Sequence, residues 1–412
     1  MSAPIDEANR TQDEPAVTLT APPDERRGRL VAVVHSDVFS RLATLVAFLL
    51  LLGPVYGILL GGRFYNSESL VFQLYENVPA LILSVGIIIP LSCGQFDLSV
   101  APLATLCVFM TIGLPIKQGL PLWVAMLVAL AVGMFVGLVN GFLVVRLHIN
   151  AFIATLATSG VVVGAYSVYS NGQTITPGTA AGSSAGTFSA FSRFGGYQEK
   201  PPIVIVWLVI AVLIASAVIS VSDRWLVAGI RARWFWTGVI AATAVVVAAI
   251  VYTNAAQQVN WSILVLLGIT WIVWAVLRLT VHGKAMYAIG GNVNAARLAG
   301  LPVNRYLFGA FVASGGIAAL AGVMLAASQG TAVPGLADTF LLPAYAAAFL
   351  STVILSAGRF HVWGALVGGL FVVWVAQGLV LGGLAYTWTD VINGAVLVCA
   401  VAFSTALRAE HR

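Results

Sequence analysis

The sequence predicts an all-α membrane protein, a polytopic bundle of transmembrane helices. Of its 412 residues, 60% are hydrophobic and 8% are charged, whereas soluble domains carry roughly 25% charged residues. The apolar residues form runs close to the roughly 20 residues that cross a bilayer as a helix. Lys and Arg fall mainly in the short loops between these runs, where they set orientation. The net charge of +5 therefore indicates no nucleic-acid partner.

The chain begins with a hydrophilic segment, residues 1–39, which is rich in Pro, Asp, Glu and Thr. We expect a disordered tail there and a transmembrane domain over residues 40–408. The tail is too polar to begin a signal peptide, so the first run should remain as an anchor. The twelve predicted spans are 41–60, 78–92, 101–116, 121–145, 151–170, 202–222, 234–253, 261–281, 306–328, 339–357, 362–383 and 389–407.

The distribution of cations supports this count. If the tail lies in the cytoplasm, strict alternation of twelve spans puts both termini in the cytoplasm together with most Lys and Arg residues. A single miscounted span would move the later cations to the other side. The cations left on the outer side are Arg63, Lys117, Arg193 and Lys200.

Two short runs, 78–92 and 101–116, flank the segment Cys93-Gly-Gln-Phe-Asp-Leu-Ser-Val100. This polar break lies near membrane depth, where irregular backbone is tolerated only inside protein or beside a wet cavity. Asp97 is the least expected charge in the chain. Intramembrane carboxylates usually face a pathway or a partner, but Asp97 and Ser99 can equally serve to cap the following helix. Both interpretations stay open.

Other polar or aromatic side chains in apolar runs are also candidates for a translocation pathway. Each costs free energy unless it is hydrogen-bonded to the bundle or to a passing solute. For every one of them, helix-to-helix hydrogen bonding is the alternative. The predicted pathway residues are Gln95, Asp97, Ser99, Asn140, Tyr345, Trp374, Gln377 and Asn393.

The segment around Asp97 resembles the Gly-Gly-Ile-Asp-Leu-Ser-Val-Gly signature of ATP-binding-cassette (ABC) importer permease subunits of the ribose and xylose kind. Four further resemblances follow in the same order, over about residues 70–405. They are Asn150-Ala-Phe-Ile-Ala-Thr-Leu156, Asn171-Gly-Gln-Thr-Ile175, Ala288 to Gly300, and Gly358-Arg-Phe-His-Val-Trp-Gly364.

The resemblance implies a division of labour in the plasma (inner) membrane of a prokaryote. Two permease copies form the pore, ABC ATPase subunits bind below, and an extracytoplasmic solute-binding protein delivers a sugar. The cargo it suggests is a monosaccharide such as xylose or ribose, although a hexose, a polyol or a signalling furanose is also compatible. Membrane lipid surrounds the complex.

We expect no cofactor and no metal site in this chain, and no enzymatic activity of its own. Its closest approach to a phosphate-binding loop, His282-Gly-Lys-Ala285, lacks both the loop and the hydroxyl that such a motif needs. ATP and Mg²⁺ should therefore be bound by the partner ATPase. The three cysteines lack the spacing of a metal site.

The loop 282–305 resembles the coupling helix that contacts the ATPase. Gly290 and Gly291 are expected to reverse the chain, and residues 293–299 to form a short helix outside the bilayer. Asn294 replaces the acid usual in the family, and an ordinary cytoplasmic turn is the alternative. The residues assigned to this contact are Gly290, Gly291, Asn292, Asn294, Ala295, Ala296, Arg297, Leu298, Gly300 and Arg305.

Two further segments distinguish the chain. Around residues 223–260 it has an extra pair of apolar runs, so a core of ten helices carries an inserted helix pair, as in the longer, xylose-type members. The external loop 171–200 is rich in Gly, Ser and Thr. We expect it to meet the solute-binding protein, although its composition alone indicates a flexible linker.

The main rival function is that of a secondary, ion-coupled transporter of a sugar or another small polar solute, with Asp97 carrying the proton. No second intramembrane carboxylate is placed to act as a relay. A membrane enzyme is more distant, because the runs lack clustered His, Asp and Glu.

Overall fold

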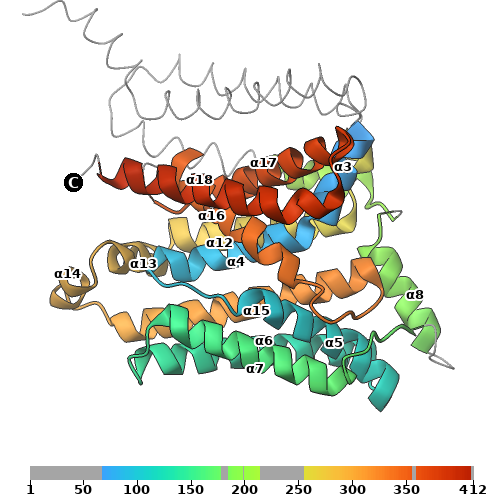
Figure 1. The fold of residues 1–412 in the computed structure, drawn as a ribbon, viewed down its shortest axis with the longest axis horizontal. Coiled ribbons are helices and arrows are strands. Elements are labelled where there is room, and N and C mark those ends of the chain that lie inside the picture. Colours follow the sequence, from blue (N-terminus) through green and yellow to red (C-terminus); the bar gives the residue numbers. More distant parts are fainter. Residues whose placement is uncertain (1–66, 178–183, 198, 214–254, 355–358, 410–412) are drawn as a thin grey trace, which may run out of the picture. The chain divides into compact units, whose positions relative to one another are not determined.

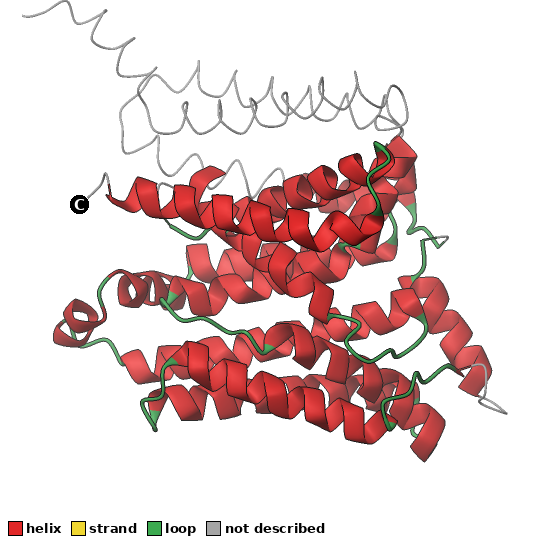
Figure 2. Ribbon diagram, in the orientation of Figure 1, coloured by secondary structure: helices red, strands yellow, loops and turns green. Residues whose placement is uncertain are grey.

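The computed structural model describes residues 67–409 except 178–183, 198, 214–254 and 355–358. These described residues form helices and turns, without a β-sheet (Figure 2), so the predicted all-α class is confirmed. Among them, six helices are long and apolar enough to cross a membrane. The count of twelve spans and the cytoplasmic termini stay predictions. The tail 1–39, the runs 41–60 and 234–253 and part of 202–222 lie outside the described residues.

Helix bounds agree closely with most of the predicted runs. The six membrane-length helices are α5 (Val100–Gln118), α6 (Leu122–Val145), α7 (Ala151–Ser170), α12 (Trp261–Leu279), α15 (Val303–Gln329) and α17 (Val362–Leu381). The other helices are α3 (Ser67–Glu76), α4 (Val78–Ser92), α8 (Ser184–Gly195), α11 (Ala255–Gln258), α13 (Val281–Gly291), α14 (Val293–Leu298), η3 (Asp338–Phe340), α16 (Leu341–Ile354), η4 (Tyr386–Trp388) and α18 (Thr389–Ala409). A short apolar helix also covers Ile203–Leu213.

Helix α4 is the centre of the bundle. It lies between α5 and α15 on one side and α16 and α17 on the other, and α6 and α7 extend the first group (Figure 1). All 15 of its residues are buried. A helix that is apolar all round is expected to be enclosed by protein. Because protein surrounds α4, its length does not have to match the thickness of the bilayer.

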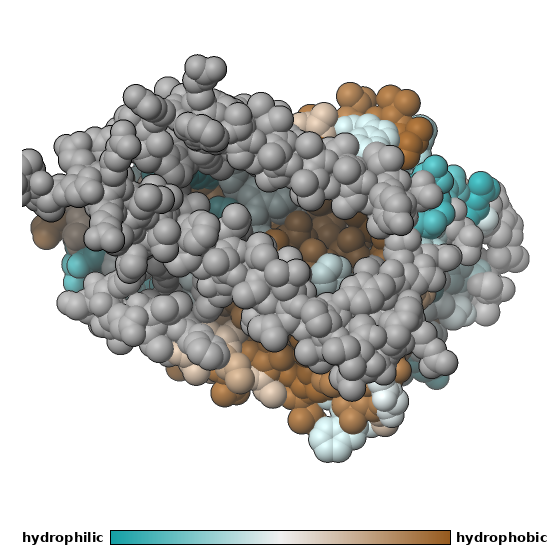
Figure 3. Space-filling view, turned by 90° about the horizontal axis from the view of Figure 1, so that it is seen from above, coloured by the Kyte–Doolittle hydropathy of each residue, from teal (hydrophilic) through white to brown (hydrophobic). Residues whose placement is uncertain are grey.

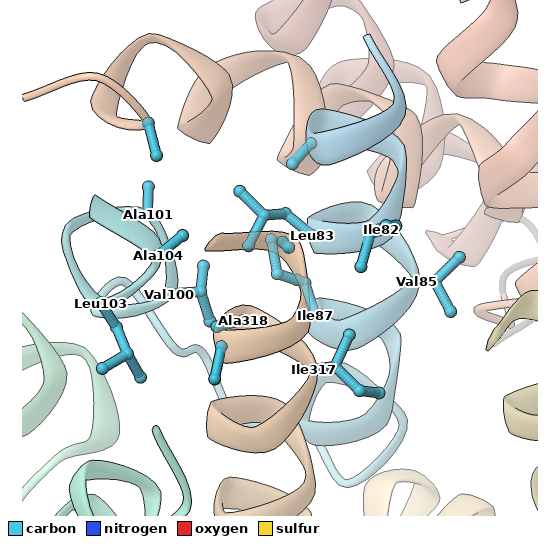
Figure 4. Packing of buried hydrophobic residues seen from close by; sticks show 14 of the residues in the cluster. Ile82, Leu83, Val85, Ile87, Val100, Ala101, Leu103, Ala104, Ile317 and Ala318 are labelled. Atoms are coloured by element: carbon cyan, nitrogen blue, oxygen red, sulfur yellow. The ribbon is translucent and has the colours of Figure 1, made fainter. Parts of the chain in front are cut away.

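The core between α4, α5 and α15 consists of aliphatic side chains. Ile82 and Ile87 of α4 lie with Leu103 of α5 and Ile317 of α15 in one buried cluster (Figure 4). Lipid tails are as apolar as these side chains, so close van der Waals packing, rather than removal from water, holds such helices together.

The outer surface of the bundle is suited to lipid. Helices α6 and α7 expose large apolar side chains, among them Trp123, Phe135, Val161 and Val168. Where the described surface is visible from above, hydrophobic residues predominate in its middle, and hydrophilic residues are visible at its left and right (Figure 3). An apolar band with polar ends is the pattern expected of a multi-pass membrane protein.

Helix α8 corrects the interpretation of the loop 171–200 as a flexible linker. It packs against α15, and the Ser262 hydroxyl of α12 donates a hydrogen bond to the Gly195 carbonyl at 3.1 Å. Ile175 also pairs with Ala332 through an isolated antiparallel bridge. A large part of the predicted loop is therefore held in place at the end of the bundle opposite α14 (Figure 1).

Candidate functional site

The first candidate site is the segment between α4 and α5, where Asp97 is fully buried. One carboxylate oxygen accepts hydrogen bonds from the Ser99 backbone N–H at 3.1 Å and from the Ser99 hydroxyl at 2.6 Å. The other accepts from the Ser314 hydroxyl of α15 at 2.8 Å. Ser99 is the N-cap residue of α5 but makes no side-chain cap itself. Asp97 thus orders the start of α5 through the Ser99 N–H and joins it to α15.

Three more helices converge on this segment. The Asn140 amide of α6 donates to the Ser99 hydroxyl at 2.8 Å, and the Leu98 N–H donates to the Thr155 hydroxyl of α7 at 3.1 Å. The Tyr345 hydroxyl of α16 donates to the Asp97 carbonyl at 2.8 Å and accepts from the Asp97 N–H at 3.1 Å. We call Asp97, Ser99, Asn140, Thr155, Ser314 and Tyr345 the Asp97 cluster.

The cluster contains four of the eight predicted pathway residues and two that were missed. Thr155 and Ser314 are single hydroxyls in apolar helices, a signal too common in membrane helices to select them from sequence. Within the described residues the Asp97 carboxylate contacts hydroxyl and N–H donors and no cation. Its bonds hold helices together, so a contact with solute stays a prediction.

The other predicted pathway residues lie apart from this cluster. Gln95 is half-buried, Trp374 and Gln377 belong to α17, and Asn393 is buried in α18. None of them hydrogen-bonds to the Asp97 cluster in the described part of the chain. Two buried atoms of the predicted pathway residues have no hydrogen-bond partner among the described residues: the Trp374 indole nitrogen and the Asn140 side-chain oxygen.

The second candidate site is helix α14, which lies at one end of the bundle (Figure 1). Asn292 caps it, because its side-chain oxygen accepts from the N–H groups of Asn294 and Ala295, each at 3.0 Å. Gly300 follows the helix with φ +80°, a conformation that favours glycine. The predicted short helix is confirmed, and it spans Val293–Leu298.

The predicted chain reversal at Gly290 and Gly291 is wrong. Both residues complete α13 in helical conformation. A Cβ atom added at Gly290 would overlap the Ser92 carbonyl oxygen at the end of α4. Gly290 is therefore needed for close approach of α13 to α4, and the predicted loop 282–305 is largely helical.

The side chains of α14 divide between the bundle and solvent. Ala296 is only 5% exposed and packs against its own chain, so it is not free to meet a partner as proposed from sequence. Leu298 is 91% exposed. Asn294, Ala295 and Arg297 are exposed as well. Solvent thus meets a small surface with one apolar side chain and one cation, and Arg305 is exposed nearby on α15.

Comparison with known proteins identifies the family. Residues 69–401 match the model of the permease component of branched-chain amino acid transport systems. The chain belongs to this permease family. The match covers α4 to α17 and both candidate sites, and the resemblance to ABC importer permeases is confirmed.

Proteins related to the permease are named for several different solutes. It is 25% identical to the xylose transport system permease protein XylH of Escherichia coli strain K12, over 91% of this chain and 93% of the relative. It is 28% identical to the autoinducer 2 import system permease protein LsrC of Enterobacter sp. strain 638, over 88% and 87%. For the ribose import permease protein RbsC of Haemophilus influenzae the identity is 23%, over 90% and 92%. No solved structure matches the permease.

Substitution of Asp97 in the permease should separate hydrogen bonding from charge. We expect Asp97→Ala to lower the free energy of unfolding by several kcal/mol, because each donor left unpaired costs roughly 1–3 kcal/mol. Asp97→Asn keeps the shape and one acceptor, so it should retain most of the stability. Thermal unfolding of the purified chain in detergent measures both. Equal stability of wild type and Asp97→Ala would contradict the anchoring role.

Proposed function

We propose that this chain forms the translocation pathway of an ABC importer for a small polar solute, a monosaccharide such as xylose or ribose. ATP hydrolysis on a separate subunit drives the transport. The observation that carries the proposal is helix α14, a six-residue helix with Leu298 exposed at its end. A capped helix that offers an apolar anchor and a cation to solvent fits a groove on a partner.

Each end of the helix bundle is assigned a different partner. The end with α14 faces the cytoplasm of a prokaryotic cell in this proposal, and the ATPase binds there with ATP and Mg²⁺. The opposite end, with α8, meets an extracytoplasmic solute-binding protein. A second copy of the chain completes the pore. The relatives named for xylose and ribose import support this assembly and the class of cargo.

The solute passes beside polar groups within the bundle. Asp97 and Tyr345 order the inner part of the pathway, and the unpaired groups of Asn140 and Trp374 offer one acceptor and one donor to sugar hydroxyls. Buried polar atoms that lack partners favour a ligand with several hydroxyl groups, because a hydrogen bond to the ligand removes their desolvation cost.

The second candidate function is ion-coupled transport, favoured by the burial of the Asp97 carboxylate among hydroxyl donors. The two functions differ for Asp97→Asn. A proton-coupled carrier should keep transport but lose its pH dependence, whereas an ATP-driven importer should keep the pH profile of the wild type. Uptake measured from pH 5 to 8 distinguishes them.

The decisive experiment is reconstitution in sealed vesicles. We expect the chain to take up labelled sugar only together with its ATPase, its solute-binding protein and ATP, and a panel of pentoses, hexoses and polyols then defines the cargo. Uptake by the chain alone, driven by an ion gradient, would contradict the proposal and favour the secondary transporter.

A further inference from the structure

A second feature at the α14 end of the bundle is a cationic pocket of about 410 Å³. The end of α12, the middle of α13 and the turn before α17 form it. Five of its lining residues carry the polar chemistry: Arg278, Lys284, Tyr287, Arg359 and His361. None of its lining residues is acidic. We call this site the basic pocket.

The cations of the basic pocket are not neutralised by the described chain. Arg278, Lys284 and Arg359 are all exposed, and none of them forms an ion pair with a described residue. The residues that precede Arg359 in the sequence, Leu355 to Gly358, include no acid. Three like charges around one cavity repel each other unless an anion binds between them.

The polar neighbours fix the walls of the basic pocket. The Tyr287 hydroxyl of α13 donates to the Phe360 carbonyl at 2.8 Å, which links α13 to the turn before α17. Burial raises the pKa of Tyr287, so this hydroxyl stays a donor. His361 caps α17, because its Nδ1 accepts from the Gly364 N–H at 3.3 Å.

The location of the basic pocket indicates the source of the anion. Arg278 is in the last turn of α12, a helix of membrane-spanning length, and lipid headgroups lie at the level of such helix ends. The adjoining residues Leu279 and Val281 are 54% and 74% exposed, so apolar surface for an acyl chain lies beside the cations. Trp274, in the pocket wall, packs near Trp363 with ring centroids 6.5 Å apart.

We propose that the basic pocket binds a phosphate group supplied by the headgroup of an anionic phospholipid. Basic pockets between membrane helices are suited to such headgroups, and the guanidinium groups of Arg278 and Arg359 suit a phosphate geometrically. The bound lipid bridges α12 and α17 to α13, the helix that leads directly into α14. It therefore stabilises the position of the proposed ATPase contact. The binding itself does not depend on the cargo or on the energy source.

The test measures lipid binding to the purified full-length chain in detergent. We expect phosphatidylglycerol, but not phosphatidylcholine, to bind and to raise the unfolding temperature. The double variant Arg278→Gln with Arg359→Gln should bind phosphatidylglycerol about ten-fold or more weakly, because it loses two charge-assisted contacts. A matched control is Arg146→Gln, which removes an exposed cation outside the basic pocket and should bind as the wild type does.

Two further measurements serve as controls: a charge-preserving variant and binding of inorganic phosphate. The charge-preserving variant Arg278→Lys with Arg359→Lys should bind better than the Gln variant, which rules out misfolding as the cause. Inorganic phosphate is tested alone. If phosphate binds to the basic pocket and phosphatidylglycerol does not, the lipid assignment is overturned. Equal lipid binding by the wild type and the Gln variant overturns the site. If an acidic segment of the ATPase is the true occupant, the Gln variant should bind the ATPase more weakly but bind phosphatidylglycerol as the wild type does. This result also overturns the proposal.

Discussion

Leu298→Asp should abolish ATP-driven uptake while the chain still inserts and folds. Leu298 is 91% exposed, so its replacement removes no packing inside the bundle. In the proposed complex it enters an apolar groove of the ATPase, where burial of a Leu contributes about 1.5–3 kcal/mol. An unpaired carboxylate in the same place adds a desolvation penalty. We therefore expect ATPase affinity to fall by about 100-fold or more, measured by co-purification and by uptake in vesicles.

The control for this variant is Asn304→Asp. Asn304 is also exposed near the same end of the bundle, in the first turn of α15, where a negative charge is favourable. It should leave uptake unchanged. Arg297→Glu, which reverses the exposed cation of α14, should also abolish uptake. Normal transport by Leu298→Asp would show that α14 does not contact the ATPase.

The choice of Leu298 shows what structure adds to sequence at this site. The sequence favours both Ala296 and Leu298 for the partner contact, because small and apolar residues in a short helix both suit docking. Only the packing distinguishes them. Ala296 lies against the bundle, so Ala296→Asp would disturb the fold before any partner binds, and its failure to transport would decide nothing.

Helix bounds could be predicted where local chemistry sets them. Helix α7 was predicted at 151–170 and both ends agree, because Asn150 caps its start by accepting from the Phe152 N–H at 2.9 Å and Asn171 ends it in the left-handed conformation with φ 53°. Helix α8 was missed. Its Gly and Ser content lowers helix propensity, and contacts with α12 and α15 override that preference.

Four of the six members of the Asp97 cluster could be predicted from the sequence. A carboxylate inside a membrane protein is costly enough to be conspicuous in sequence, and this indicates Asp97. Ser99, Asn140 and Tyr345 are indicated as polar or aromatic side chains within or beside apolar runs. The meeting of α5, α6, α7, α15 and α16 at this cluster depends on tertiary packing that no local pattern records. Tertiary packing also explains the error at Gly290. The sequence favours a turn at this glycine, whereas the structure needs glycine there because α4 approaches α13 closely.

Gly290→Ala should destabilise the chain and uncouple it from ATP hydrolysis, whereas Gly291→Ala should do neither. The new Cβ at Gly290 overlaps the Ser92 carbonyl oxygen and lies 3.2 Å from the Gly94 nitrogen, so α13 must move away from α4. Such overpacking against backbone costs about 1–3 kcal/mol. It also displaces α14, which follows α13 directly. Unfolding temperature and uptake per ATP hydrolysed measure the two effects.

The adjacent glycine is the matched control. A Cβ at Gly291 meets no atom within 4 Å, and alanine in a helix is favoured over glycine by about 0.5–1 kcal/mol. Gly291→Ala should therefore be neutral or slightly stabilising, with normal coupling. Because the two substitutions are chemically identical and one residue apart, helix propensity cancels between them. Equal behaviour of the two variants would show that the close contact between α13 and α4 is needed neither for stability nor for coupling.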